Sequence, residues 1–188
     1  MACGSLAFLG APCSVAFPCH QAPAWQPVSA LLEAGEWNPR LEIIAVPENA
    51  SDTNAERFDA QADVVVDYAP LFAERFARNR AAVRQRKPMV EAAVYELEAR
   101  RTSLVPGRGP CLRCLCPEMP ATRTRRFPVS GAVAASVGGM AALEVIKLIA
   151  GLGQPLAGRR LTFDLRDPRF QPVNVRRDPD GPECAEVK

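Results

Sequence analysis

The sequence predicts an α/β protein with an incomplete Rossmann-like sheet, flanking helices and a C-terminal β-hairpin. Residues 62–68, ADVVVDY, contain a continuous apolar run that ends in an acid, as in a strand buried on both faces of a parallel sheet. Residues 71–86 combine apolar positions at helical spacing with many charged side chains, the pattern of an amphipathic helix. Strands and helices alternate along the chain, which favours a doubly wound, parallel-rich sheet with right-handed crossovers.

The elements of the first half can be placed by the breaks between them. Asn38-Pro39 ends a short helix expected over residues 28–35, because the residue before a proline avoids the helical region. Residues 41–46, LEIIAV, are rich in β-branched side chains and are bounded by prolines, which predicts a strand. The other elements expected are a helix over 54–59, a strand over 62–68, a helix over 71–86, and strands over 88–94 and 97–105.

A connection over residues 106–128, rich in proline, glycine and cysteine, separates these elements from a long apolar segment. Residues 131–152 predict a helix that begins after Ser130, a favourable N-cap residue, and ends at Gly151 and Gly153. The last elements expected are two strands over 161–165 and 172–175, paired as a hairpin around the turn at 166–168.

Composition divides the chain into two parts. The first 32 residues carry no charged side chain, so we expect an atypical N-terminal segment over 1–27 and one α/β domain over 28–188. The whole chain has 188 residues and a formal net charge of +2. This charge gives no field that would favour nucleic acid as a partner.

Two segments could be mistaken for membrane or targeting signals. The uncharged N-terminal segment lacks the basic start of a signal peptide, and prolines interrupt it. Residues 131–152 are long enough to cross a bilayer, but Glu144 and Lys147 lie in their middle and are costly in hydrocarbon. We therefore expect a helix buried in a soluble, cytoplasmic protein without a membrane partner.

Cysteines form the most specific local pattern. Cys111 and Cys114 are spaced as C-x-x-C after glycines and a proline, a knuckle that can place two thiolates on one metal ion. Cys116 follows closely, and Cys184 stands in the C-terminal tail. The alternative is a set of buried, inert thiols, because a complete zinc site needs a second pair of ligands.

Two further features could bind ligands. Asp67 ends an apolar strand, and ligands of open parallel sheets bind beyond the carboxyl ends of strands, where an acid can hold a metal ion or a ribose. Asp67 could equally be a solvated loop acid or a helix N-cap. An arginine set in the connection could bind phosphate or an acidic partner, or belong to a solvated loop; its members are Arg123, Arg125 and Arg126.

In their order and spacing these features resemble the ThiF/MoeB/HesA family, the bacterial relatives of ubiquitin-activating enzymes. The resemblance covers roughly residues 28–184. It rests on Asn38-Pro39 before a strand, ADVVVD before a helix with Arg75 and Asn79, KPMV opening a strand, and CLRCLCP. SGAVAASVGGMAALEVIKLIAG and LTFDLRDPRFQPVNVRRDPDGPEC complete the series.

The resemblance implies a Rossmann-like fold that binds ATP and Mg²⁺ and adenylates the C-terminal glycine of a ubiquitin-like sulfur carrier. It also implies a homodimer and a structural zinc ion held by four cysteines. Carried onto this chain, Cys111, Cys114 and Cys184 match three zinc ligands. Gly181 stands where the fourth cysteine is usual, and Cys116 is the nearest replacement.

This chain departs from the family pattern at the nucleotide site. No G-x-G-x-x-G precedes the matching region, which indicates a truncated or degenerate member lacking the first nucleotide-binding βαβ unit. Asp67-Tyr68-Ala69-Pro70 puts a proline where the family's Mg²⁺-binding aspartate is usual. We expect a sheet edge that is open or covered by residues 1–27, and a chain unable to adenylate alone.

Three alternatives to an autonomous adenylyltransferase follow from these departures. A partner chain could supply the nucleotide-binding groups. The chain could instead be a non-catalytic module for dimerisation or carrier docking. Outside the family, it could be a fragment of a dinucleotide-binding oxidoreductase, which the missing glycine fingerprint also disfavours.

Overall fold

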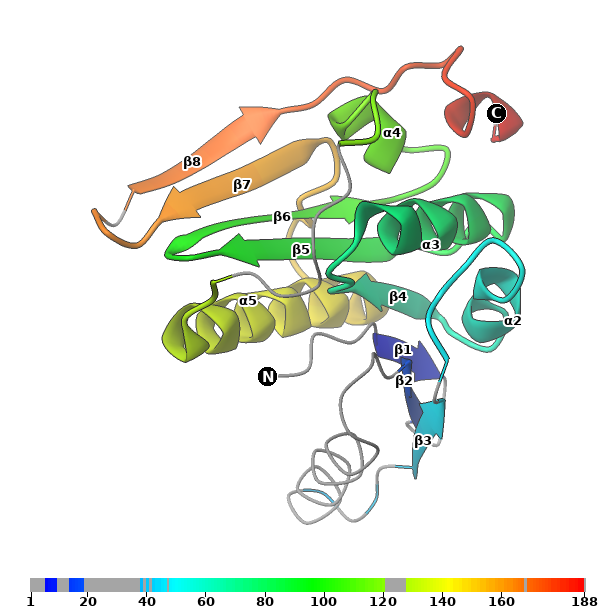
Figure 1. Cartoon of the computed structure of the whole chain (residues 1–188). Coiled ribbons are helices and arrows are strands. Elements are labelled where there is room, and N and C mark those ends of the chain that lie inside the picture. The colour runs from blue at the N-terminus through cyan, green and yellow to red at the C-terminus, as the bar shows by residue number, and fades with distance from the viewer. Residues whose placement is uncertain are drawn as a thin grey trace.

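The computed structural model shows a single mixed sheet of eight strands in the order β3-β2-β1-β4-β5-β6-β7-β8 (Figure 1). The structure describes residues 6–9, 14–18, 38, 40, 42–46, 48–120, 128–167 and 169–187. The strands are β1 (Leu6–Leu9), β2 (Ser14–Pro18), β3 (Glu42–Val46), β4 (Val64–Asp67), β5 (Met89–Tyr95), β6 (Glu98–Leu104), β7 (Arg159–Asp164) and β8 (Arg169–Asn174).

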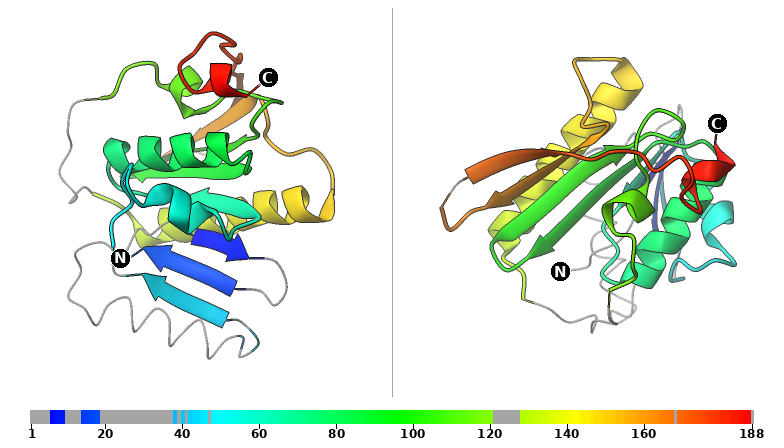
Figure 2. Two further views of the ribbon diagram at one scale, coloured as in Figure 1. Left: turned by 90° about the vertical axis from the view of Figure 1, so that its right-hand side faces the viewer. Right: turned by 90° about the horizontal axis from the view of Figure 1, so that it is seen from above.

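Helices cover both faces of the sheet. Helix α3 (Phe72–Arg84) lies on one face together with α2 (Ala55–Asp59) and α4 (Leu112–Leu115), and α5 (Gly131–Ala150) lies on the other (Figures 1 and 2). The short 3₁₀ helix η1 (Cys184–Glu186) packs near α3 at the C-terminus. The α/β class, the flanking helices and the C-terminal hairpin of β7 and β8 agree with the sequence-based prediction.

The sheet is less parallel than the sequence predicted. Strand pairs β2–β3 and β4–β5 are parallel, and the other adjacent pairs are antiparallel. The α3 crossover makes β4 and β5 parallel. Strands β5 and β6 are instead joined directly by a tight turn in which Glu96 has a φ of 52°. A turn this short can only reverse the chain, so the two strands must be antiparallel.

The N-terminal strands cover the edge of the sheet next to β4. Strand β1 pairs antiparallel with β4, with Ala7 opposite Val65, and β2 continues the sheet to β3. The sequence left two outcomes open, an exposed edge or one covered by residues 1–27, and the structure has the second. The helix expected over residues 28–35 lies outside the described residues.

Strand β4 explains why the sheet has two cores. All four of its residues are buried. Val65 packs with Phe76 of α3 on one face, whereas Val64 and Val66 pack with Val145 of α5 on the other. The continuous apolar run in the sequence therefore corresponds to a strand with a helix on each face, as expected.

Helix α5 is buried along one side only, which corrects the expectation of a buried helix. Val133, Val137 and Val145 face the sheet. The opposite side exposes Leu143 and Ile149 at 58% and 60% of their surface. By length and composition alone α5 would be able to cross a membrane. Ser130 occupies the N-cap position without a side-chain cap bond, and Gly151 ends the helix in the left-handed conformation at φ 63°.

Candidate functional site

Asp67 lies at the carboxyl end of β4 and is fully buried. Its Oδ2 atom is 3.2 Å from Nη1 of Arg75, and its Oδ1 atom accepts a hydrogen bond from the Ala69 backbone N–H. The same arginine donates to Glu91 of β5 at 2.7 Å and to the Ala92 carbonyl at 3.1 Å. Arg75 thus ties the ends of two neighbouring strands to α3, and Asp67 belongs to this ion-pair network.

Glu91 adds a second buried carboxyl group to the network around Arg75. It is fully buried, and burial raises the pKa of its carboxyl although Arg75 and Arg100 oppose the shift. Arg75 serves two carboxyl groups, and Arg100 is 3.9 Å from Glu91. Two acids at one buried site therefore depend on shared positive charge.

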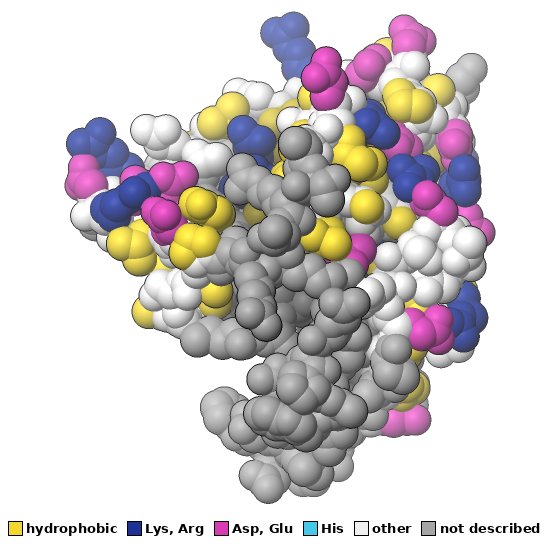
Figure 3. All heavy atoms as spheres, in the orientation of Figure 1, with side chains coloured by type: hydrophobic (Ala, Val, Ile, Leu, Met, Phe, Trp, Pro, Cys, Tyr) yellow, Lys and Arg dark blue, Asp and Glu magenta, His cyan; other side chains and the backbone are white. Residues whose placement is uncertain are grey.

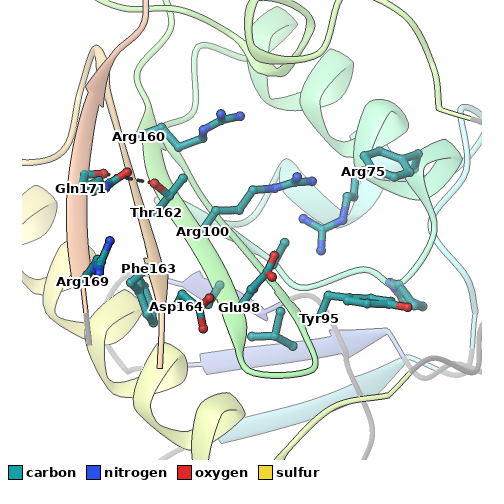
Figure 4. A pocket seen from close by; sticks show the side chains of 15 residues that line it. Arg75, Tyr95, Glu98, Arg100, Arg160, Thr162, Phe163, Asp164, Arg169 and Gln171 are labelled. Atoms are coloured by element: carbon teal, nitrogen blue, oxygen red, sulfur yellow. Dashed lines mark hydrogen bonds between the residues drawn. The ribbon is translucent and has the colours of Figure 1, made fainter. Parts of the chain in front are cut away.

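A pocket of about 430 Å³ opens beside this network. It begins at Pro70 and Phe72, where β4 leads into α3, and extends over the face of β5, β6, β7 and β8 opposite α5. Its polar lining comes from residues that alternate along the strands. These residues are Tyr95, Glu98, Arg100, Arg160, Thr162, Asp164, Arg169 and Gln171 (Figure 4).

Strand register explains why these side chains share one face. Arg100 is paired with Thr162, and Glu98 with Asp164. The residues between them point the other way, so Ala99 and Phe163 pack against Val133 and Val137 of α5. At these paired positions the sheet is therefore apolar toward α5 and polar toward the pocket.

Among the described residues on the face shown in Figure 3, there is no field of a single charge. Over the face in Figure 3, basic and acidic side chains are intermixed around the β7–β8 hairpin and along the side of α2 and α3. The arginine set Arg123, Arg125 and Arg126 lies outside the described residues.

The sulfur atoms of Cys111, Cys114 and Cys184 lie within 4.8 Å of one another. The Sγ–Sγ distances are 3.8 Å between Cys111 and Cys114 and 3.5 Å between Cys114 and Cys184. Four thiolates at about 2.3 Å from a zinc ion would be about 3.8 Å apart, so these spacings fit three corners of a zinc tetrahedron. The three residues could therefore hold a metal ion.

The surroundings of the cluster also suit a metal. The Asp178 backbone N–H points at Cys114 Sγ at 3.3 Å, the type of contact that stabilises a thiolate. Burial raises the pKa of Cys111 to about 12 and also raises the pKa of Cys184. Without a cation these thiols stay protonated at neutral pH, whereas zinc would bind them as thiolates.

The fourth corner has no cysteine. Cys116, the expected replacement, donates its thiol to the Glu118 carbonyl at 3.2 Å and is not part of the cluster. Gly181 lies buried on the tail, and a Cβ atom there would be 3.3 Å from the Asp178 carbonyl oxygen. Among the described residues, three side chains form this candidate metal site.

Two polar contacts position the cluster and the long helix. Asn79 of α3 accepts a hydrogen bond from the Leu112 backbone N–H at 2.8 Å, which fixes the C-x-x-C turn.

Glu144 of α5 accepts from Ser103 Oγ and from the Leu156 backbone N–H, both at 2.7 Å. The charged residue in the middle of the apolar helix therefore joins α5 to β6 and to the chain entering β7.

The sequence of residues 28–185 matches the ThiF family. The chain belongs to the ThiF family. Among ThiF-type relatives, Protein HesA of Leptolyngbya boryana is 43% identical over 147 residues, which cover 78% of this chain and 53% of the relative. Sulfur carrier protein adenylyltransferase of Thermus thermophilus is 34% identical over 158 residues, covering 79% of this chain and 58% of the relative. The chain thus spans little more than half the length of these curated relatives.

Solved structures place the ThiF chain in the same fold. E. coli MccB with ATP aligns with a TM-score of 0.69 at 20% identity, covering 82% of this chain and 49% of MccB. PaaA aligns with a TM-score of 0.65 at 16% identity, covering 81% of this chain and 48% of PaaA. The incomplete Rossmann-like, ThiF-type sheet expected from the sequence is therefore confirmed as the fold class.

Sequence reasoning predicted that Cys111, Cys114 and Cys184 come together, but it missed the pocket; the role proposed for Asp67 stays a prediction. Arg100, Arg160 and Asp164 carry no motif of their own. They converge because the β6–β7 register aligns them, and that register depends on a pairing between strands far apart in the chain. Alternation of polar and apolar residues along 160–164, RLTFD, was the signal that could have indicated a polar face.

Proposed function

We propose that this chain takes part in the ATP-dependent activation of the C-terminal glycine of a ubiquitin-like sulfur carrier. The observation that carries the proposal is the pocket that begins at Pro70, at the carboxyl end of β4, within a ThiF-family domain. Ligands of open α/β sheets bind at such strand ends. The relatives named "Sulfur carrier protein adenylyltransferase" and "SAMP-activating enzyme E1" support the reaction class.

In this proposal the pocket receives the extended tail of the carrier. Its floor is the polar face of β5 to β8, and Phe72 and Arg75 stand at the end next to β4. The terminal carboxylate would attack the α-phosphorus of ATP at that end, forming an acyl-adenylate and releasing pyrophosphate. In this proposal the tail lies along the polar face of the sheet, which is the face opposite α5.

The nucleotide side of the reaction is where this chain differs from the family pattern. Pro70 offers no side-chain oxygen for Mg²⁺ at the position where an aspartate is usual, and Asp67 is engaged by Arg75. Removing a group that compensates transition-state charge commonly costs about 10²-fold or more in rate. We therefore propose that the described chain binds the carrier but does not adenylate it efficiently unless a partner chain contributes to the nucleotide site.

Carrier-dependent ATP–pyrophosphate exchange, measured beside carrier binding, tests this proposal. We expect saturable binding of a ubiquitin-like sulfur carrier with exchange near background, and exchange that appears when an intact ThiF-family relative is added. Exchange by the chain alone would show an autonomous enzyme. Binding without exchange in any mixture would favour the alternative, a docking module. Family membership favours both of these over a fragment of a dinucleotide-binding oxidoreductase.

We also propose that Cys111, Cys114 and Cys184 bind a structural zinc ion. The spacing of their sulfur atoms and the Asp178 N–H contact support this. A bound zinc would join the C-x-x-C turn to the tail and so stabilise the end of the domain. Free thiols and zinc would agree with the cytoplasmic location expected from the sequence.

A second copy of the chain is our proposed partner at α5. Leu143, Ile146, Ile149 and Leu152 expose between 51% and 60% of their surfaces along one side of the helix and the turn after it. An apolar stripe of this kind is unusual on a monomer and marks an interaction surface. Because the family resemblance implies a homodimer, we expect a second copy of the chain to cover this surface of α5.

A further inference from the structure

The two acidic side chains of the pocket, Glu98 and Asp164, are paired with an arginine that lies outside the pocket lining. Glu98 and Asp164 face each other across β6 and β7, where two like charges repel. Arg166 from the β7–β8 turn contacts both, with its Nε 3.0 Å from Asp164 Oδ1. Arg169 in turn lies 2.6 Å from Asp167 and is largely exposed. The outer end of the pocket is thus a set of paired charges.

The inner end of the pocket is different, because its arginines outnumber the accessible acids. In Figure 4 Arg100 and Arg160 extend from the sheet toward α3, and Arg75 extends from α3 toward the sheet, while Asp164 lies toward the other end. Arg75 is occupied by the buried acids Asp67 and Glu91. The two remaining arginines, Arg100 and Arg160, project from β6 and β7 into the open volume.

Arg160 has no ion-pair or side-chain hydrogen-bond partner in the described part of the chain, and its Nε is buried without one. Arg100 reaches Glu91 at 3.9 Å, beyond hydrogen-bond distance, and its guanidinium lies 5.9 Å from the centre of the Phe72 ring. Glu91 already accepts a hydrogen bond from Arg75 at 2.7 Å, so the two arginines share this one buried carboxyl group with a closer partner. Two forked donors therefore face the pocket with their hydrogen-bonding capacity unused.

We propose that Arg100 and Arg160 bind a side-chain carboxylate of the carrier tail, placed just before its terminal glycines. This inference rests on the proposed function, which puts the terminal carboxylate at the Pro70 end of the same pocket. An extended tail advances about 3.3 Å per residue, so a side chain one or two residues upstream would stand further along the sheet. The preferred substrate is therefore a carrier with an acidic residue beside its C-terminal glycine pair.

Fluorescence anisotropy with labelled octapeptides tests the inference on the full chain. One peptide ends in Glu-Gly-Gly, a second in Gln-Gly-Gly, and a third in Glu-Gly-Gly with a C-terminal amide. We expect the Glu peptide to bind about tenfold more tightly than the Gln peptide, as charge-assisted hydrogen bonds require. Arg160→Gln and Arg100→Gln should each reduce this preference, and the double variant should abolish it.

The matched control is Arg57→Gln, which removes an arginine of α2 that pairs with Glu48 far from the pocket. It should keep the full preference. Circular dichroism and urea unfolding test whether the variants are folded. We expect them to fold, because the side chains of Arg57, Arg100 and Arg160 are exposed or only partly buried.

The outcomes separate the inference from the proposed function. Equal binding of the Glu and Gln peptides, or a preference that persists in the double variant, overturns the inference and leaves the proposed function standing. Loss of binding on amidation, with no effect of Glu to Gln, also overturns it, because the arginines would then hold the terminal carboxylate. Failure of every peptide and of the folded carrier to bind overturns both.

Discussion

The Sγ atom of Cys184 lies 3.5 Å from that of Cys114, although 70 residues separate them in the chain. The tail reaches this position through several contacts. Arg177 donates to the Cys184 carbonyl at 2.7 Å, and Arg84 of α3 lies 3.2 Å from Glu186. The meeting of the two cysteines is therefore supported by contacts that do not involve sulfur.

We predict that zinc copurifies with the chain and that its content falls when the tail cysteine is removed. Cys184→Ser should lower the zinc measured by mass spectrometry after purification without chelator, because only two thiolates would remain on the turn. Cys116→Ser is the control and should leave the zinc content unchanged, since Cys116 donates to the Glu118 carbonyl instead. Stoichiometric zinc in Cys184→Ser would show that the tail cysteine is not a ligand.

Gly181→Cys should close the fourth corner and make zinc harder to remove. The new Cβ would meet the Asp178 carbonyl and carboxylate oxygens at 3.3 Å, a contact that a shift of a few tenths of an ångström relieves. We expect zinc release to a chelator to slow by at least about tenfold, because closed sites hold zinc more firmly than sites with a solvent ligand. Gly139→Cys, which adds an exposed thiol on α5 with open space around it, should not change the release rate.

The sequence predicted those parts of the fold that depend on local pattern. The buried strand β4 and the antiparallel terminal hairpin were visible as apolar runs and turn residues. The Cys111, Cys114 and Cys184 cluster was reached through the resemblance. The sequence did not predict the pocket lining or the antiparallel direction of β6, because both depend on pairing between strands across the sheet.

Charged residues in α3 were misjudged for a related reason. The amphipathic pattern placed them toward solvent, but Arg75 and Arg78 are buried at 7% and 0% exposure. Both meet acids on other elements, Asp67 and Asp59. A buried charge can be predicted only with its partner, and these partners come from separate segments of the chain.

Removing Glu144 should destabilise the domain strongly. Burial alone would raise the pKa of Glu144, but hydrogen bonds from Lys147, Leu156 and Ser103 hold it below its ordinary value. Glu144→Ala leaves a buried hydroxyl and a backbone N–H without an acceptor, which should cost about 3 kcal/mol or more of unfolding free energy in urea. Glu186→Gln, at an exposed ion pair with Arg84, should cost less than about 1 kcal/mol. Equal losses in the two variants would contradict this role for Glu144.

Charges on the open side of α5 should separate the proposed dimer. Ile146→Glu combined with Ile149→Glu places two carboxylates on side chains that are 51% and 60% exposed, so the fold should survive while the apolar contact is lost. Light scattering after size exclusion should report a dimer for the native chain and a monomer for the variant. Gln61→Glu, an exposed change next to α2, should stay dimeric. A monomeric native chain at micromolar concentration would refute the proposal.

Asp59 should make stability depend on pH. It lies 2.9 Å from Arg78 with both side chains fully buried, but the contact lacks hydrogen-bond geometry. Burial therefore raises the pKa of Asp59 from 3.8 to about 7, with Arg78 opposing the shift. Because the folded state holds this proton more firmly than the unfolded state, its contribution is fully present below about pH 3.8 and is lost as the pH rises through about 7.

Asp59→Asn keeps the shape of the protonated carboxyl and removes this titration. The stability of the native chain relative to Asp59→Asn should therefore fall between pH 4.5 and pH 8, by no more than about 4 kcal/mol, when both are unfolded in urea. Asp63→Asn, which removes an exposed carboxylate nearby, is the matched control and should show no comparable trend. A stability difference that rises with pH would mean that Arg78 holds Asp59 ionised, because a lowered pKa reverses the sign of the linkage.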